Sequence, residues 1–348
     1  MKIYEVPQYR SDLETELKNT ELEFLRGKSI LVTGSTGLIC SAIVDMLLFS
    51  NKYFNTGIRI FAAGRGEEKL RQRFDFSGGD IRFVRYDALK PFESDEHFDY
   101  IIHGASNASP ELYVTQPVET MLSNIVGINN LLESAINNGT RRLLYISSSE
   151  VYGRKDYAGP FKEDEYGYVD ILNVRSSYPS GKRASETLCR AYGSEYNIET
   201  VIVRPGHIYG PTASTNDKRI SSDFAYKAAR GENLVMKSAG TQLRSYCYCL
   251  DCASAILTVL GKGENGQAYN ISNSASVITI RQMSQILADS ANVDLIVEAA
   301  SAEEQAAFNP MNNSSLEAGR LEALGWAGSF DAQAGFSHTV TILREMIR

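Results

Sequence analysis

The 348-residue sequence has no apolar run long enough to span a membrane, and its first residues, MKIYEVPQYR, lack the apolar core of a secretory signal. Excess positive charge is also missing: the net charge is −7, whereas a surface that binds nucleic acid is typically basic. The five cysteines show no framework spacing, which favours a reducing compartment over a disulfide scaffold. We therefore expect a cytoplasmic protein whose partners include neither a membrane nor a nucleic acid.

Three of the cysteines, Cys247, Cys249 and Cys252, are close enough in sequence to suggest a zinc site. Structural zinc takes four ligands, and no fourth ligand is evident near these thiols. We interpret the three cysteines as small buried residues and expect no metal.

Strand-length apolar runs alternate with helical patterns along most of the chain. A hydrophobic fraction of 43% in 348 residues is enough to bury one large core or two smaller ones. Buried strands that alternate with helices predict an α/β fold with a doubly wound parallel sheet of the Rossmann type. The predicted strands are 29–33, 58–62, 81–85, 100–103, 143–147, 200–203 and 268–271, and the predicted helices include 38–50, 117–137 and 181–195.

Changes in this pattern divide the chain into parts. Residues 28–206 are predicted to form the dinucleotide-binding domain, which a returning strand in 267–272 completes. Residues 207–266 and 273–348 mix helices with short strands and are predicted to form a smaller C-terminal α/β substrate domain. The cleft is expected at the carboxyl ends of the parallel strands.

Residues 1–27 precede these domains and are predicted to be a helical extension. Their charged sequence is interspersed with leucines that give an amphipathic helix over 11–26, namely Leu13, Leu17, Leu22 and Leu25.

A glycine-rich turn follows the first predicted strand and precedes a predicted helix. Gly34 and Gly37 let backbone amides approach a pyrophosphate, whose charge the helix N-terminus favours, and the third small position is Cys40. The second strand is followed by Arg65 instead of the carboxylate that binds an NAD ribose, and an arginine suits the 2′-phosphate of NADP. Asp87 follows the third strand and is positioned to bond the adenine. The predicted cofactor is therefore NAD or NADP.

The segment from Leu143 to Lys182 carries the strongest chemical signal. An apolar run ends in three serines and Glu150, and Tyr178 lies four residues before Lys182 on a predicted helix. That spacing places both side chains on one helical face. An ammonium near a phenol favours the phenolate, which enables Tyr178 to act as a base near neutral pH. Together with the glycine-rich turn, these residues predict hydride chemistry on a hydroxyl-bearing substrate.

From about residue 28 onward, the sequence resembles the extended short-chain dehydrogenase/reductase family that acts on nucleotide sugars. The resemblance rests on Thr33-Gly-x-x-Gly37, the strand-end serines, Val151-Tyr-Gly153 and Tyr178-x-x-x-Lys182, which occur in the family's order and approximate spacing. It implies that Ser148 hydrogen-bonds the C4 oxygen of the sugar and that Tyr178 takes the C4 proton. It also implies that Lys182 binds the nicotinamide ribose and lowers the pKa of the tyrosine.

The same resemblance implies which residues contact the cofactor. They lie on the glycine-rich turn, at the ends of the next strands and on the catalytic helix, namely Gly34, Ser35, Thr36, Gly37, Leu38, Ile39, Arg65, Asp87, Ala88, Ala105, Ser106, Asn124, Tyr178 and Lys182.

Ser149 and Glu150, which follow Ser148, indicate the subfamily. Related dehydratases place Asp-Glu there, whereas Ser-Glu is similar to UDP-glucuronate decarboxylases, whose motif reads Thr-Ser-Glu-Val-Tyr-Gly. In such chemistry the C4 ketone lets the neighbouring carboxylate leave as CO₂, with Arg244 orienting that carboxylate or the phosphates and Glu150 assisting near C5. The resemblance implies a UDP-sugar substrate held by Ser149, Arg175, His207, Arg219 and Arg244.

Two departures leave the reaction open. His207 replaces the asparagine that the family offers to the substrate diphosphate, and Arg65 suits a reductase that draws on NADPH better than a decarboxylase that retains NAD. The alternatives are a 4-epimerase, an NADPH-dependent 4-keto-sugar reductase, a 4,6-dehydratase that Ser149 disfavours, and a nucleotide-binding sensor without turnover. Helices 117–137 and 181–195 form the dimer interface in this family, so a homodimer is expected by resemblance.

Overall fold

The computed structural model describes residues 2–74, 81–155, 159–299 and 311–348. Its centre is a sheet of seven parallel strands in the order β10-β6-β5-β4-β1-β2-β3, which confirms the predicted Rossmann-type α/β fold. The strands are β1 (Ser29–Thr33), β2 (Arg59–Gly64), β3 (Ile81–Arg85), β4 (Tyr100–His103), β5 (Arg142–Ile146), β6 (Glu199–Pro205) and β10 (Ala268–Ile271).

Strand β1 lies between β2 and β4 and is buried at every position. Its side chains alternate between two cores: Ile30 and Val32 join one, and Leu31 joins the other. Burial on both faces explains why this strand reads as an unbroken apolar run in the sequence.

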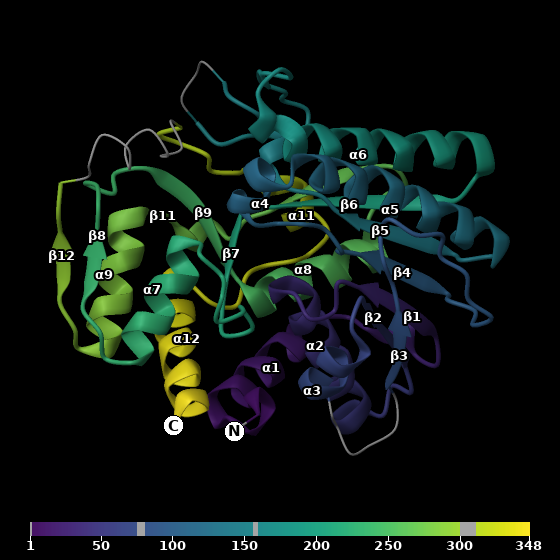
Figure 1. Ribbon diagram of the computed structural model, residues 1–348. Coiled ribbons are helices and arrows are strands. Elements are labelled where there is room, and N and C mark those ends of the chain that lie inside the picture. The colour runs from purple at the N-terminus through teal and green to yellow at the C-terminus, as the bar shows by residue number, and fades with distance from the viewer. Residues whose placement is uncertain (1, 75–80, 156–158, 300–310) are drawn as a thin grey trace.

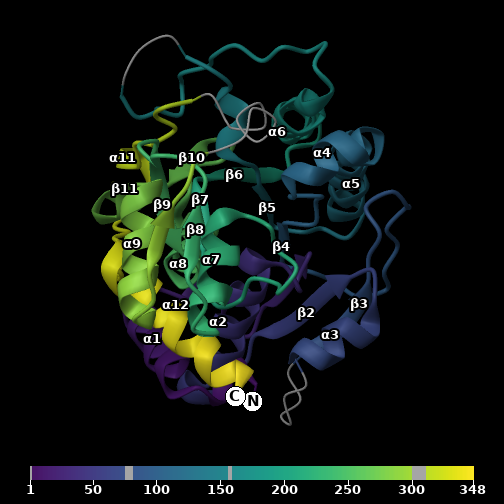
Figure 2. The same ribbon diagram turned by 60° about the vertical axis from the view of Figure 1, so that its left-hand side comes forward.

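Helices cover both faces of the sheet, as Figures 1 and 2 show. Helices α2 (Leu38–Phe54) and α8 (Cys249–Lys262) lie on one face, and α5 (Pro117–Asn137) and α6 (Ser177–Tyr196) lie side by side on the other. Helix α6 begins four residues earlier than predicted, because Pro179 sits in its first turn, where a missing amide costs no hydrogen bond. Within the described segments, no helix is both long and apolar enough to cross a membrane.

The C-terminal part adds two small sheets beside the large one. Strands β7 (His207–Tyr209), β9 (Leu243–Tyr248) and β11 (Val277–Thr279) form one sheet, and β8 (Leu234–Met236) pairs with β12 (Leu295–Val297) in the other. The helices of this part are α7 (Ile220–Ala229), α9 (Ile280–Ala291), the short α11 (Gly319–Glu322) and α12 (Ala332–Ile347). Two short helices complete the part that contains the large sheet, α3 (Glu67–Phe74) and α4 (Pro110–Thr115).

The N-terminal helix, α1 (Pro7–Asn19), begins and ends earlier than the predicted range of 11–26, because Pro7 starts it and the chain turns at Thr20. The four predicted leucines are all buried. Figure 1 places α1 beside α2 and α12, with the two chain ends close together. Its polar contacts reach both parts of the molecule: Tyr9 donates to Asp45 of α2 at 2.7 Å, and Asp12 lies 3.0 Å from His338 of α12.

A second acidic side chain of α1, Glu16, is buried against Asp251 of α8. Burial, and then the contact with Glu16, raise the pKa of Asp251 well above its usual range. The folded protein therefore holds a proton on this pair of carboxyl groups that the unfolded chain would release. The stability that depends on this proton is complete below the pKa of an ordinary aspartate and is lost as the pH rises toward the folded-state pKa.

We expect the substitution Glu16→Gln to flatten the fall of the melting temperature with rising pH. The amide keeps a hydrogen bond to Asp251 but carries no charge, so no proton must be held between two carboxylates. Thermal unfolding of the parent and of Glu16→Gln, from acidic to mildly alkaline pH, gives the slope of melting temperature against pH for each protein. Glu14→Gln, which changes an exposed glutamate of the same helix, is the control. Equal slopes for Glu16→Gln and the parent would contradict the shared proton.

Candidate active site

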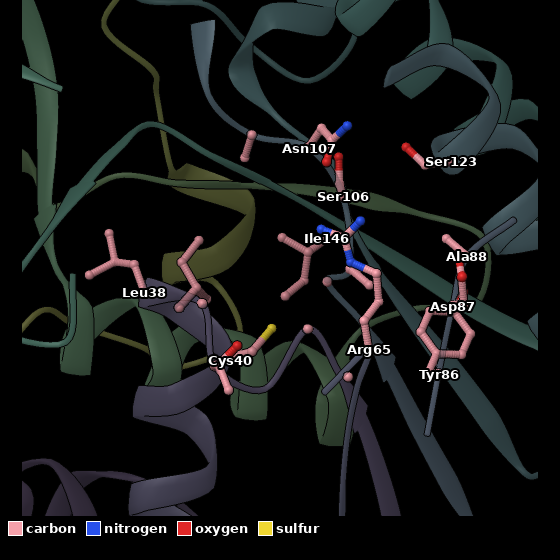
Figure 3. A pocket seen from close by; sticks show the side chains of 18 of the residues that line it. Leu38, Cys40, Arg65, Tyr86, Asp87, Ala88, Ser106, Asn107, Ser123 and Ile146 are labelled. Carbon is pink, nitrogen blue, oxygen red and sulfur yellow. The ribbon is translucent and has the colours of Figure 1, made fainter. Parts of the chain in front are cut away.

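A cavity of about 340 Å³ lies at the carboxyl ends of the sheet strands, where the strand order reverses between β1 and β4. Figure 3 shows Leu38 and Cys40 toward one end of this cavity and Tyr86 and Asp87 toward the other. The ends of five neighbouring strands, β5, β4, β1, β2 and β3, contribute to its lining, and α5 adds Glu119 and Ser123. The lining also includes Arg219, from the C-terminal part of the chain, so both parts of the molecule meet at the cavity.

The glycine-rich turn has the shape that a close backbone approach requires. Gly34 has a φ of +72°, and a Cβ there would lie 2.9 Å from the amide nitrogen of Ala105 at the end of β4. Helix α2 begins directly after Gly37, so the positive end of its dipole faces the cavity. The turn therefore fits a dinucleotide pyrophosphate: its backbone is open, and no side chain fills the space.

Most of the predicted cofactor residues line this cavity, namely Gly34, Thr36, Gly37, Leu38, Ile39, Arg65, Asp87, Ala88, Ala105 and Ser106. The structure does not place Ser35 at the cavity. Its hydroxyl donates to the Val32 carbonyl and accepts from the Ala63 amide, so it ties the turn to β2. Asn124 is buried behind the lining, where its Oδ1 accepts from Ser106 at 3.1 Å.

Sequence reasoning missed several lining residues, of which Glu119 matters most. Its carboxylate lies 3.6 Å from the Arg65 guanidinium, and both side chains border the cavity. Arg65 is therefore not a lone cation at the end of β2. No local pattern marks Glu119, because it reaches the cavity only through the packing of α5 against the sheet.

The proposed base, Tyr178, is the second residue of α6 and is buried. Its hydroxyl is hydrogen-bonded to Ser148, which follows β5 and also accepts from the Glu150 amide at 3.2 Å. Lys182 lies one turn later, with its Nζ 5.7 Å from the centre of the Tyr178 ring. The structure thus brings together the three residues that the sequence motifs predicted: Ser148, Tyr178 and Lys182.

One electrostatic expectation is wrong in this structure. Lys182 was expected to lower the pKa of Tyr178, but burial, followed by the charge of Glu150, raises that pKa to about 12. The groups that lower it are Ser148, Tyr113 and Arg219. Lys182 instead donates to the Ile146 carbonyl at 2.7 Å, and burial lowers its own pKa to about 7, which weakens its charge near the tyrosine.

Glu150 and Arg175, two further predicted site residues, form an ion pair. The guanidinium donates to both carboxylate oxygens, at 3.0 and 3.1 Å. Arg175 also lies over the ring of Tyr113, 5.8 Å from its centre. Tyr113 was not predicted, although it stacks directly on Tyr178.

A second polar group forms around His207, Arg219 and Arg244. Burial, and then the two arginines, lower the pKa of His207 to about 3, so its ring is neutral, and its buried Nδ1 has no partner among the described residues. Arg244 is only 4% exposed and donates to the Leu243 carbonyl, and no carboxylate of the described segments pairs with it. Arg219 is paired with Asp217 and influences both His207 and Tyr178, so it connects this group to the catalytic residues. Ser149, the remaining predicted residue, is half-buried in the turn after Ser148.

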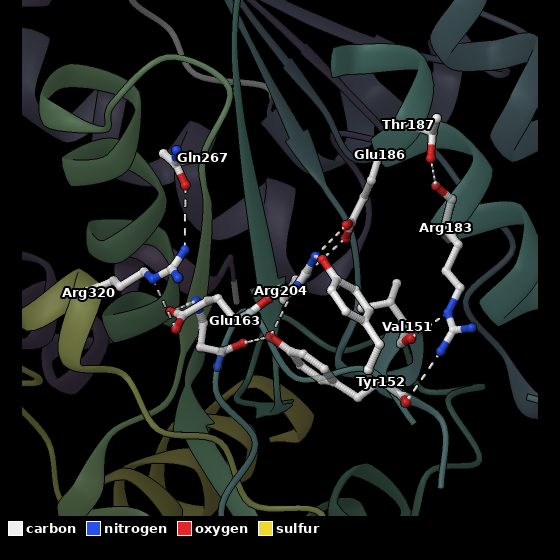
Figure 4. Close-up of polar contacts among 11 residues, drawn as sticks. Val151, Tyr152, Glu163, Arg183, Glu186, Thr187, Arg204, Gln267 and Arg320 are labelled. Carbon is white, nitrogen blue, oxygen red and sulfur yellow. Dashed lines mark hydrogen bonds and ion pairs between the residues drawn. The ribbon is translucent and has the colours of Figure 1, made fainter. Parts of the chain in front are cut away.

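A buried network supports the turn that carries Ser148 and Glu150. Arg204 of β6 donates to both carboxylate oxygens of Glu186 on α6, at 3.0 and 2.6 Å, and to the Tyr152 hydroxyl (Figure 4). Tyr152 in turn donates to Asn270 of β10. These contacts fix the 3-10 turn Ser149–Tyr152 against the sheet and account for the structural part of the Val-Tyr-Gly motif.

The five cysteines are buried and free, as expected for small core residues. Burial raises the pKa of the Cys247, Cys249 and Cys252 thiols, which keeps them protonated. Among the described residues, no three or more His, Cys, Asp or Glu side chains are grouped to hold a metal ion.

The fold and the cavity define a Rossmann-type protein with a dinucleotide site. A family model described as the NAD dependent epimerase/dehydratase family matches residues 30–272, and the chain belongs to this family. UDP-glucuronic acid decarboxylase 6 of Arabidopsis thaliana is 35% identical over 263 residues, which cover 75% of this chain and 74% of that protein. UDP-glucuronic acid decarboxylase 3 of the same plant is 36% identical over 70% of this chain and 69% of its own length.

Solved structures share the fold at lower identity. The UDP-glucose 4-epimerase of Thermotoga maritima has a TM-score of 0.76 and 22% identity, and the alignment covers 92% of this chain and 100% of that one. A dTDP-glucose 4,6-dehydratase of Streptomyces venezuelae has a TM-score of 0.75 and 24% identity, covering 91% and 97% of the two chains.

We expect Gly34→Ala to weaken dinucleotide binding at least tenfold, because the added methyl group would meet the Ala105 backbone. Isothermal titration with NAD measures the change. Gly139→Ala is a matched control: that glycine has a similar φ of +65°, but nothing lies within 4 Å of its Cβ position. Both variants carry the same backbone strain, and only Gly34→Ala adds the clash. Equal binding by the two variants would exclude the glycine-rich turn as the cofactor site.

Proposed function

We propose that the protein is a UDP-glucuronate decarboxylase-like enzyme that oxidises the sugar at C4 and releases its carboxylate as CO₂. The observation that carries the proposal is Arg244, a buried guanidinium with no carboxylate partner in the described segments, beside the neutral His207. An uncompensated buried cation is costly, and an anionic ligand offsets that cost. The relatives that are 35–36% identical carry the name UDP-glucuronic acid decarboxylase, which supports the same reaction.

The catalytic residues divide the work at C4. Ser148 holds the C4 oxygen, and Tyr178, to which it is hydrogen-bonded, removes the hydroxyl proton. A nicotinamide held in the cavity would supply the hydride acceptor for C4 and the same hydride for the final reduction. Lys182 is anchored by the Ile146 carbonyl one helical turn from Tyr178, and its amine would bind the cofactor ribose.

Oxidation at C4 places the C5 carboxylate β to a ketone. The bond between C5 and the carboxylate then breaks, CO₂ leaves, and the electron pair is delocalised onto the ketone oxygen before C5 takes a proton. Arg244 orients the leaving carboxylate or the diphosphate, and Arg219 bridges the anion-binding group and the base. Glu150 would assist near C5, and its ion pair with Arg175 reduces its repulsion of an acidic substrate.

We propose NAD as the cofactor. The missing carboxylate at the end of β2 favours NADP, but Glu119 supplies a carboxylate to the same region and partly neutralises Arg65. A 2′-phosphate placed between them would meet one negative charge as well as one positive charge.

We expect incubation with UDP-glucuronate to give a UDP-pentose with loss of CO₂, without an added reductant, because the hydride is returned. Mass spectrometry of the products, with NAD and NADP compared as additives, measures this. Tyr178→Phe should lower the rate at least a hundredfold, because the base is lost.

Other outcomes identify the alternatives. A mass-neutral change of UDP-glucose or UDP-galactose would indicate a 4-epimerase. Turnover only with NADPH and a 4-keto sugar would indicate a reductase. Full activity of Tyr178→Phe would overturn the assignment of the base.

We further propose that α5 and α6 form a homodimer contact, which three exposed apolar side chains of α5 support: Val118, Met121 and Leu122. Light scattering should give twice the 38.5 kDa of one chain, and Leu122→Asp should reduce that mass. Val297→Asp is the control, because Val297 is as exposed as Leu122, at 44%, but lies on β12. A mass of one chain for the unchanged protein would contradict the dimer.

A further inference from the structure

Tyr113 lies against the catalytic tyrosine in a way that no sequence motif indicates. It belongs to the short helix α4, and its ring stacks on that of Tyr178 with centres 4.2 Å apart and planes inclined by only 8°. Both rings are buried, at 3% and 6% exposure. Two buried rings packed this closely and nearly parallel leave Tyr178 little freedom to tilt.

The stacked rings bring the Tyr113 hydroxyl near the Tyr178 hydroxyl, and the Ser148 hydroxyl acts on the same phenol from the turn after β5. An oxygen with two donors carries negative charge more readily than one with a single donor, because hydrogen bonds to an ionised group are the stronger ones. Consistent with this, both Tyr113 and Ser148 lower the pKa of Tyr178.

Further contacts hold Tyr113 in place. The Ser177 hydroxyl donates to its carbonyl oxygen at 3.2 Å, which joins α4 to the residue just before Tyr178. Arg175 lies over its ring and binds Glu150 through two hydrogen bonds. Tyr113 therefore lies between the catalytic phenol and the ion pair formed by Glu150 and Arg175.

We propose that Tyr113 is a positioning residue for Tyr178: its ring fixes the plane of the catalytic phenol, and its hydroxyl is the second donor that stabilises the phenolate. This inference rests on the proposed function, in which Tyr178 removes the C4 proton. It assigns a task in proton transfer to a residue outside the motif of Ser148, Tyr178 and Lys182.

The substitution Tyr113→Phe tests the hydroxyl, because phenylalanine keeps the stacked ring. Without the donor the pKa of Tyr178 rises, so a smaller fraction of Tyr178 is ionised at a given pH. The acidic limb of the kcat profile should move to higher pH by about one unit, the order expected for one hydrogen bond to a charged oxygen. At neutral pH, kcat should fall about tenfold and KM should change by less than about twofold. Tyr113→Leu, which also removes the stacking ring, should lower kcat further.

The matched control is Tyr269→Phe. Tyr269 is a buried residue of β10 outside the site, and its hydroxyl accepts a hydrogen bond from the Glu264 amide. This substitution should leave the pH profile unchanged. Melting temperatures of all variants show whether each protein is folded, and the retained ring makes Tyr113→Phe the informative variant if Tyr113→Leu fails to fold.

Comparing Tyr113→Phe with Tyr178→Phe distinguishes an error in the role of Tyr113 from an error in the proposed function. An unshifted profile for Tyr113→Phe, together with an inactive Tyr178→Phe, would overturn the role of Tyr113 and leave the base assigned. A fall in kcat that is the same at every pH would show that Tyr113 only packs against Tyr178 and would also overturn the inference. A shift of the acidic limb equal to that of Tyr269→Phe would do the same. Full activity of Tyr178→Phe would instead contradict the proposed function itself.

Discussion

The pairing of β1 with β4 is the constraint on which the site depends. The two strands are far apart in sequence, yet Thr33 lies opposite His103, and its hydroxyl contacts the His103 ring at 2.7 Å and accepts from the Ala105 amide at 3.3 Å. Burial lowers the pKa of His103 to about 3, so the contact is uncharged across the physiological range. This contact joins two strand ends at the switch point of the sheet. Both the glycine-rich turn and the loop after β4 are thereby directed into one cavity.

Burial decides the charge of nearly every group around that cavity. The pKa of Tyr178 rises to about 12, that of His207 falls to about 3 and that of Lys182 falls to about 7, in each case first because of desolvation. The full charges that remain belong mainly to arginines, of which Arg65, Arg175 and Arg219 each have a carboxylate partner within the chain. Arg244 has no such partner among the residues that the structure describes, and burying an unpaired cation is costly unless an anion offsets it.

The sequence predicts the parts of this arrangement that leave a local signal. The strands β1, β3, β4 and β10 have the predicted bounds, and Ser148, Tyr178 and Lys182 are marked by their spacing. Strands β1 and β4 are buried at every position, as an uninterrupted apolar run predicts for a parallel strand. Ser35 shows the limit of such patterns: it belongs to the glycine-rich turn, but its hydroxyl serves the fold and not the cavity.

Glu119 and Tyr113 carry no local signal, because they reach the site through the packing of α5 and α4. Their roles depend on contacts with Arg65 and Tyr178, which only the tertiary structure supplies.

Tertiary contacts also decide the role of α1, which the sequence predicts to be an extension before the main fold. Its residues lie outside the range 30–272 that matches the family model, yet Tyr9, Asp12 and Glu16 are buried and contact α2, α8 and α12. Helix α2 begins at the glycine-rich turn, and α12 belongs to the C-terminal part that supplies Arg219 to the cavity. Helix α1 therefore packs against both parts whose relative position shapes the cavity. It is therefore an integral component of the scaffold around the cavity.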